Sequence, residues 1–181
     1  MTIVVSRECT ADDIRLLRQF SCCSNKEEPK EYEIDPQRYI RGLKESDFDE
    51  DVIKMILTTA QSEKIFAFAE YGYLEKPGTY VISWVASSAE CTGNRLGASL
   101  LLIVLDEIGI DAFQCKRSHQ VLTQIDPRNQ ASIQMFEHAG FEDTGVDQAD
   151  SEYHIWQRTV DPHAGPREKR EFITPNLFIE Q

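Results

Sequence analysis

The stretch Trp84–Leu101 has the residue types and spacing that could bind a phosphate group. A strand runs into a loop of small residues and then into a long apolar helix. The first N–H groups of a helix have no partner within it, and together with the helix dipole they favour an anion. Gly93, Gly97 and Ala98 leave room near the backbone, and Arg95 could contact a phosphate. A glycine that only permits the turn explains the same pattern, so this stretch alone is weak evidence.

The segment Asn129–Phe141 carries a second and more specific pattern, NQASIQMFEHAGF. It is similar to the helix N-x-x-(A/S)-I-x-x-(Y/F)-E-x-x-G-F of the Gcn5-related N-acetyltransferase (GNAT) family. Trp84–Leu101 resembles the same family's pyrophosphate-binding loop, usually Arg/Gln-x-x-Gly-x-Gly/Ala. Thr92 stands at the usual Arg/Gln and Arg95 at the first usual Gly, so only Gly97 fits this shorter signature.

The resemblance, which covers roughly Thr2 to Val160, implies acetyl-CoA as the co-substrate. Backbone groups at the end of the central strand would pair with the pantetheine arm, and loop amides would hold the pyrophosphate. Asn129 would hydrogen-bond the pantetheine or the reaction centre. The implied cofactor-binding residues are Val85, Ala86, Ser87, Thr92, Gly93, Asn94, Arg95, Leu96, Gly97, Ala98, Asn129, Ser132 and Phe136.

Acyl transfer requires a neutral amine held near the thioester carbonyl, and a general base helps to deprotonate it. Many GNAT members use a Glu in the central strand, but Thr79–Ser87 has no carboxylate. Glu70, on the preceding strand, and Asn129 are the candidate catalytic residues, although an exposed strand carboxylate without a catalytic role is the simpler explanation of Glu70. Phe136 lies where many members carry a tyrosine that protonates the leaving thiolate, and Phe has no proton to give.

Other side chains could replace the missing groups. Ser83 could position a water molecule, and Tyr71 or His154 could serve as the acid. The sequence ranks none of the three above a purely structural role.

Charge bears on the acceptor substrate. The formal net charge of −12 repels polyanions, so neither nucleic acid nor an anionic membrane is an expected partner. In the resembled family the acceptor enters between two loops that are both acidic in this chain. The residues are Glu27, Glu28, Glu31 and Glu33 in the first loop, and Asp143, Asp147, Asp150 and Glu152 in the second. This distribution of acidic residues suits a cationic amine acceptor. Acidic surface residues that only keep the protein soluble explain it as well.

The leading hypothesis is an N-acetyltransferase that moves an acetyl or other small acyl group from acyl-CoA to a primary amine by direct attack. The alternative is a catalytically weak GNAT-like domain that binds acyl-CoA or a protein partner. Phe136, the missing strand carboxylate and the apolar residues Leu177-Phe178-Ile179 motivate that alternative. A third hypothesis, an unrelated α/β domain with another phosphate ligand, is disfavoured by Asn129–Phe141.

The elements that must position these residues follow from hydrophobic periodicity. Strands are predicted at Thr2–Glu8, Lys64–Tyr73, Thr79–Ser87, Gln120–Ile125, Phe141–Val146 and Glu152–Val160. Helices are predicted after Thr10, from Asp35-Pro36 to about Lys44, over Leu96–Ile108 with Gly109 ending it, and over Ala131–His138; Val52–Ala60 fits a helix or a strand. This order predicts an α/β fold with a central mixed sheet covered by helices on both faces. The resemblance adds a splay of that sheet between Thr79–Ser87 and Gln120–Ile125.

The chain divides into one domain, residues 1–160, and a tail, residues 161–181, that docks on the domain or on a neighbour; a homodimer is one such arrangement. Five cysteines, an odd number without a CxxC pair, favour reduced thiols, and the four scattered histidines disfavour a metal site. The chain begins without a signal-peptide pattern and has no run long enough to span a membrane. A cytoplasmic protein is therefore expected.

Overall fold

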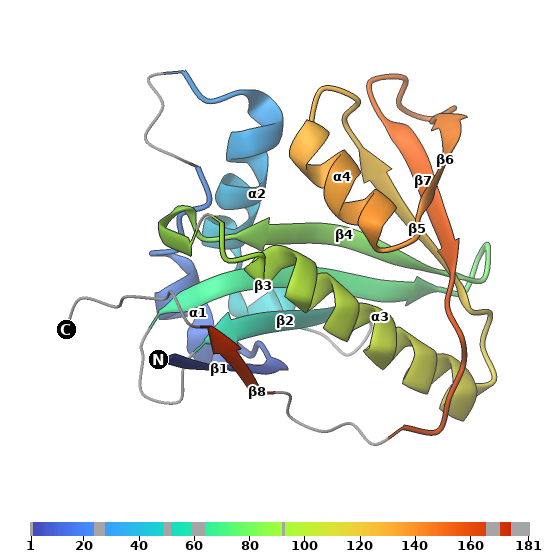
Figure 1. Cartoon of the computed structure of the whole chain (residues 1–181), viewed down its shortest axis with the longest axis horizontal. Coiled ribbons are helices and arrows are strands. Elements are labelled where there is room, and N and C mark those ends of the chain that lie inside the picture. The colour runs from blue at the N-terminus through green and yellow to red at the C-terminus, as the bar shows by residue number, and fades with distance from the viewer. Residues whose placement is uncertain are drawn as a thin grey trace.

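A computed structural model describes residues 2–23, 28–48, 52–58, 64–91, 93–165 and 171–174, and Figure 1 shows their arrangement. The strands are β1 (Thr2–Glu8), β2 (Val52–Thr58), β3 (Ile65–Leu74), β4 (Thr79–Ser87), β5 (Gln120–Ile125), β6 (Glu142–Val146), β7 (His154–Thr159) and β8 (Glu171–Thr174). The α-helices are α1 (Ile14–Leu17), α2 (Glu31–Gly42), α3 (Leu96–Cys115) and α4 (Gln130–His138). Short 3-10 helices cover Ala11–Asp13, Glu45–Asp47 and Ala89–Cys91.

All of these strands form one mixed sheet in the order β6-β7-β5-β4-β3-β2-β1-β8. The pairs are antiparallel except β4 and β5, which run parallel and are joined by the crossover helix α3. The predicted order of elements is confirmed, and the ambiguous Val52–Ala60 contributes a strand. The tail adds the strand β8, which pairs with β1 so that Thr174 lies opposite Thr2. The apolar residues Leu177-Phe178-Ile179 lie outside the described residues.

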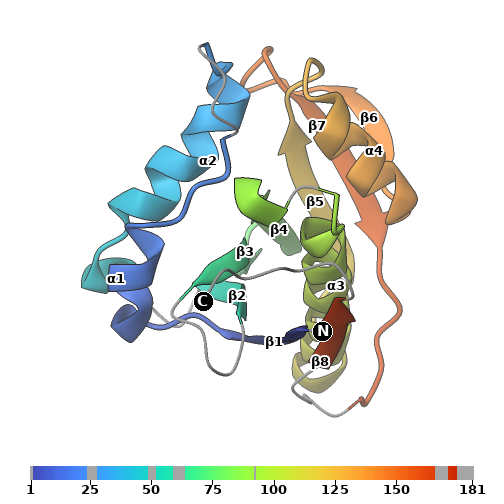
Figure 2. The same cartoon turned by 60° about the vertical axis from the view of Figure 1, so that its left-hand side comes forward.

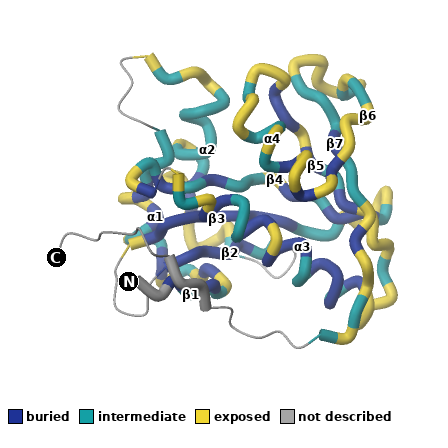
Figure 3. The backbone as a smooth tube through the Cα atoms, viewed as in Figure 1, coloured by how far each residue is buried: buried dark blue, intermediate teal, exposed yellow. Residues whose placement is uncertain are grey.

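Helices cover both faces of the sheet, as Figure 2 shows: α1 and α2 lie on one side, α3 and α4 on the other. Leu100 and Val104 of α3 are fully buried in the core cluster of that side, and Leu17 and Ile40 in the cluster under α1 and α2. Burial of one such side chain stabilises the fold by about 1.5–3 kcal/mol. The central strand β3 is buried over its first seven residues, which appear dark blue in Figure 3.

Two predicted helix boundaries are wrong. Gly109 does not end α3, which continues to Cys115 and is followed by Lys116 in the left-handed region at φ 53°. Gly109 instead permits a close approach, because a Cβ there would lie 2.9 Å from the carbonyl oxygen of Asp161. The His163 N–H also donates to the Gly109 carbonyl at 3.2 Å.

The other wrong boundary is the start of α2. The helix begins at Glu31, and Pro36 lies within it. Glu33 is responsible for the earlier start, since its carboxylate accepts a hydrogen bond from the Lys30 N–H at 3.0 Å. Pro36 therefore lies beyond the first turn, where it lacks the N–H that would bond the carbonyl four residues earlier.

The described residues contain no helix that combines the length and the apolarity needed to cross a membrane.

Candidate functional site

The strands β4 and β5 part in the middle of the sheet. They pair only at Tyr80–Val121 and Val81–Leu122, and just beyond these pairs the Thr123 hydroxyl donates to the Ile82 carbonyl at 2.9 Å. On its other edge, β4 shifts register against β3, so that Ser83 is an extra residue between two paired ones. Such a bulge bends a strand. The expected splay between these two strands is therefore present, and its apex is at Ile82.

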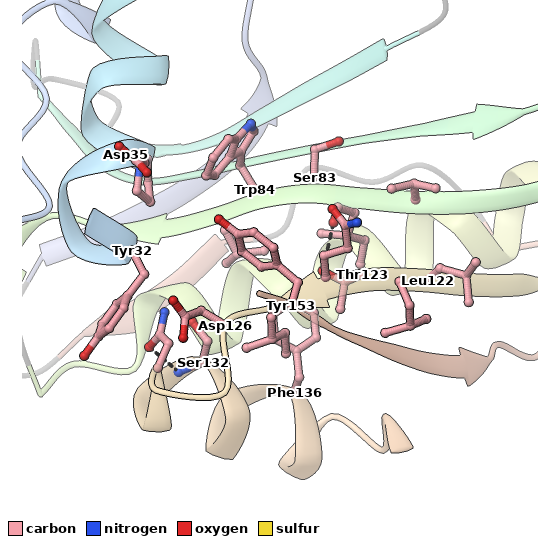
Figure 4. A pocket seen from close by; sticks show the side chains of 18 of the residues that line it. Tyr32, Asp35, Ser83, Trp84, Leu122, Thr123, Asp126, Ser132, Phe136 and Tyr153 are labelled. Atoms are coloured by element: carbon pink, nitrogen blue, oxygen red, sulfur yellow. Dashed lines mark hydrogen bonds between the residues drawn. The ribbon is translucent and has the colours of Figure 1, made fainter. Parts of the chain in front are cut away.

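A cavity of about 550 Å³ opens where the strands part. Its walls come from β4, β5, the first turns of α2 and α4, and the loop before β7, as Figure 4 shows. Of the expected site residues, Val85, Asn129, Ser132 and Phe136 line it. The structure thus brings together residues of two segments that the sequence could relate only by resemblance.

One backbone edge of β4 is left open beside this cavity. Val85, Ala86 and Ser87 pair with β3 on one side, opposite Ala69, Phe68 and Ala67. No strand of the described part of the chain pairs with their other side. An extended ligand chain could therefore hydrogen-bond to β4 as an added strand does.

The loop after β4 leads into the start of α3. Gly93 has φ 88°, and Arg95, the residue before α3, is held in the left-handed region at φ 56° with its side chain exposed. Asn94 closes the loop, since its N–H and side-chain amide both donate to the Cys91 carbonyl, at 3.1 and 3.3 Å. Thr92, another expected cofactor-binding residue, lies outside the described residues.

The first turn of α3 places Leu96, Gly97 and Ala98 at the helix start, where backbone N–H groups have no helical partner. The Leu96 side chain is 2% exposed and belongs to the core, so only its backbone is available. Gly97 has a packing role, because a Cβ there would lie 2.5 Å from the Ser87 hydroxyl oxygen. The glycine therefore lets the start of α3 approach the end of β4.

The motif Asn129–Phe141 forms α4 and its two ends. The Asn129 side-chain oxygen accepts a hydrogen bond from the Ser132 N–H at 3.1 Å, which caps the helix. Phe136 is 5% exposed and packs edge-to-face on Phe141 with ring centroids 5.0 Å apart. Phe136 thus presents a hydrocarbon ring, and no hydroxyl, to the cavity.

Glu70 does not face the cavity, in contrast to the expectation that it acts as general base. Its carboxylate is 6% exposed, lies 3.4 Å from the Lys54 ammonium, and accepts a hydrogen bond from the Tyr39 hydroxyl. Tyr39 stacks on Trp84, a residue of the cavity wall, with ring centroids 5.0 Å apart. Glu70 is therefore linked to the cavity through two aromatic rings, and its carboxylate is already paired.

The three alternative polar residues are dispersed. Ser83 lies on the cavity wall and is exposed. His154 is not a lining residue and bonds Asp143 through Nδ1 at 2.7 Å. Tyr71 is 4% exposed within the core.

Tyr153 is a cavity residue that sequence reasoning missed. Burial raises the pKa of its phenol, and four nearby carboxylates raise it further, those of Asp126, Asp150, Asp35 and Glu152. Asp35 and Asp126 also line the cavity. Because these groups come from α2, the turn after β5 and the loop before β7, no sequence spacing indicates that they meet.

Arg128 partly neutralises this group of carboxylates. It contacts Asp126 with its Nε and Nη2 atoms, at 2.9 and 2.7 Å, and the resulting hydrogen bonds lower the pKa of that carboxyl. Glu27, one of the acidic residues predicted to face the acceptor, lies outside the described residues. The structure shows no cluster of three or more metal-ligating side chains in the part of the chain that it describes.

Comparison with known proteins finds matches among structures only. No protein-family model matches the sequence, and no curated protein matches it. A GNAT-family protein from Desulfovibrio desulfuricans is 17% identical with a TM-score of 0.62, and the alignment covers 86% of this chain and 98% of that one. The PaiA N-acetyltransferase from Thermoplasma acidophilum, solved in complex with coenzyme A, is 15% identical with a TM-score of 0.63, over 86% and 98% of the two chains.

The ribosomal-protein-S18-alanine N-acetyltransferase from Escherichia coli is 15% identical with a TM-score of 0.60, over 97% of this chain and 99% of that one. At such identities the likeness establishes the fold. The order of the elements, the parting of β4 and β5 and these structures agree, and the chain has the fold of the GNAT acetyltransferases.

Proposed function

We propose that the protein transfers an acetyl or other small acyl group from acyl-CoA to a primary amine by direct attack. The observation that carries this proposal is the open edge of β4 at Val85–Ser87, beside the cavity where β4 and β5 part. The fold supports it, since a protein of the same fold was solved with coenzyme A.

The residues present fit acyl-CoA. The open edge of β4 would hold the amide-containing pantetheine arm, and the start of α3 would receive the pyrophosphate. Gly93 leaves open space beside the loop, since a Cβ there would meet nothing within 4 Å. Bound acyl-CoA would supply an activated thioester carbonyl. The chain's own part is to hold the two reactants together and exclude water from the cavity.

The acceptor in this proposal is a cationic amine. Asp35, Asp126, Asp150 and Glu152 are all close enough to Tyr153 to raise its pKa, and two of them line the cavity. A cation entering here would be attracted by these carboxylates, and the net charge of −12 would steer it from a distance.

Phe136 supports a second candidate function, a domain that binds acyl-CoA or a protein partner with little turnover. A phenylalanine at this place offers no proton to the leaving thiolate. The transferase and an acyl-CoA-binding domain share the first binding step and differ in the release of free thiol.

Calorimetry with acetyl-CoA tests the shared step, and failure to bind at concentrations up to about 1 mM, the upper end of usual KM values, would falsify the transferase and the acyl-CoA-binding domain and leave the binding of a protein partner. Free thiol is then measured during reaction with a panel of primary amines. Release above the rate without amine supports the transferase, and its absence with every amine leaves the binding domain. Each cationic amine is paired with a neutral analogue of similar size; neutral analogues that react equally well would exclude the cationic acceptor.

A further inference from the structure

We infer that Tyr153 is the catalytic residue that donates a proton to the leaving thiolate, in place of the tyrosine that Phe136 replaces. This inference rests on the proposed acyl transfer. It assigns the role to a residue of the loop between β6 and β7, on the side of the cavity opposite β4, rather than to α4.

Tyr153 is positioned to reach the reacting thioester. Tyr153 and Phe136 line the same cavity from different elements. Figure 4 shows the Tyr153 ring reaching from its loop across the gap between the strands, with its hydroxyl directed toward β4 and Trp84. A thioester aligned along the open edge of β4 would therefore lie within reach of this hydroxyl.

The Tyr153 hydroxyl is also available to donate a proton. Within the described residues, the Tyr153 hydroxyl has no hydrogen-bond partner in the protein, while its backbone is fixed by bonds to Asp147 and Asp150. The hydroxyls of Tyr39 and Tyr80 instead donate to Glu70 and Asp111.

Tyr32 is the other tyrosine that lines the cavity. Its ring lies 5.5 Å from the Lys30 ammonium, and Figure 4 shows its hydroxyl at the edge of the site, directed away from β4. Tyr153 is thus the cavity phenol placed to act on the thioester.

The amine nitrogen bonds to the thioester carbonyl carbon, the carbon–sulfur bond breaks, and its electron pair leaves with sulfur. The Tyr153 hydroxyl gives its proton to that sulfur. After the attack the nitrogen is positively charged, and it transfers one of its protons to the Tyr153 phenolate. The products are an amide and a free thiol, and Tyr153 is unchanged.

The surrounding charge favours the protonated phenol before and after the transfer. Burial and the four carboxylates raise the Tyr153 pKa, so the phenol is protonated at neutral pH before each turnover. The same carboxylates disfavour a lasting phenolate, and the return of the proton from nitrogen is therefore favourable.

The test compares three proteins by thiol release at saturating acetyl-CoA and acceptor: the wild type, Tyr153→Phe and the control Tyr73→Phe. Tyr73 lies outside the cavity and packs on Tyr80 and Arg117, so its hydroxyl has no part in the proposed reaction. We expect Tyr153→Phe to lower kcat about 100-fold, within the usual range for a general acid, with the Kd for CoA unchanged. Tyr73→Phe keeps the wild-type kcat.

A second measurement separates proton donation from packing. Incorporation of 3-fluorotyrosine at position 153 lowers the phenol pKa and barely changes its shape. A general acid must be protonated, so kcat falls as pH rises through its pKa, and the fluorinated protein should show this fall at lower pH than wild type.

The outcomes distinguish this inference from the proposed function. If the wild type releases no thiol with any amine, the proposed transfer fails and the inference fails with it. If the wild type is active but Tyr153→Phe matches Tyr73→Phe, transfer stands and the role of Tyr153 is overturned. The role of Tyr153 is also overturned if Tyr153→Phe lowers kcat but the fluorinated protein loses activity at the same alkaline pH as the wild type.

Discussion

The buried ion pair between Lys54 and Glu70 offers a way to separate stabilisation from catalysis. The substitution Glu70→Gln keeps the size of the side chain and an acceptor for the Tyr39 hydroxyl, and it removes only the negative charge. The Lys54 side chain, 2% exposed, would then remain charged in the interior. Its other contacts are the Asp47 carbonyl at 2.5 Å and the Phe48 ring, with the ammonium 5.2 Å from the ring centroid.

The magnitude follows from these contacts. Removal of one member of a buried pair usually costs about 3–5 kcal/mol, because the other charge is left uncompensated. The carbonyl of Asp47 and the retained acceptor for Tyr39 place Glu70→Gln at the lower end, about 3 kcal/mol. The double variant Lys54→Met/Glu70→Gln buries no charge. We therefore expect it to lose only about 1 kcal/mol, chiefly the hydrogen bond to Asp47.

Urea unfolding of the wild type, both single variants and the double variant measures the coupling. A matched control is Glu90→Gln, which breaks the exposed pair with Lys64 (side chains 66% and 55% exposed) and should change stability by less than about 0.5 kcal/mol. The reasoning is refuted if Glu70→Gln costs no more than Glu90→Gln, or if the effects of the two single variants simply add. A folded Glu70→Gln protein should keep its kcat; a loss of more than about tenfold would make Glu70 the base after all.

Three further predictions concern packing, pH and thiol reactivity. Gly97→Ala should lower the free energy of unfolding, measured in urea, by about 1–2 kcal/mol, because the added Cβ clashes with the Ser87 hydroxyl. In a Ser87→Ala background the same substitution should be neutral or stabilising, because that clash is gone and alanine favours a helix. The hydrogen bond from Arg7 lowers the pKa of Asp13, so this pair stabilises the fold above the unfolded pKa of about 3.9, and the stabilisation is lost as pH falls through the lower folded pKa. Asp13→Asn should therefore flatten the dependence of the urea midpoint on pH in that acid range. An unchanged slope would count against a stabilising role of the pair. Cys115, the exposed cysteine, should react with a thiol reagent in the native protein well before the other four, as mass spectrometry of the labelled peptides would report; equal labelling of all five would contradict the described burial.

Local patterns predicted most of the fold. The bounds of β1, β4 and β5 match the predicted strands residue for residue, since alternating apolar and β-branched residues mark them clearly. The two wrong helix boundaries share a cause. Gly109 favours the end of a helix, and Pro36 favours its first turn. The close approach of Asp161 to Gly109 and the capping of α2 by Glu33 determine the observed boundaries instead.

The candidate site could be predicted where one segment carries several of its residues. Ser132 and Phe136 lie on α4 and Asn129 caps that helix, so all three line the cavity together. The sequence indicates only which strand carries Glu70, and its partners Lys54 and Tyr39 come from elements that the sequence does not relate to it. Tyr153 belongs to a loop without a motif, so its place in the cavity depends on how β7 packs beside β5.

The pairing of β8 with β1 has a consequence for biosynthesis. Thr2 lies opposite Thr174, so β1 meets one of its two neighbours only after all the residues between these two strands have been translated. At a usual synthesis rate of about 5–20 residues per second, that edge of β1 stays uncovered on the ribosome for roughly 10–30 seconds. A bare strand edge can recruit other chains, which makes this interval a time when chaperones would be expected to matter for the yield of folded protein.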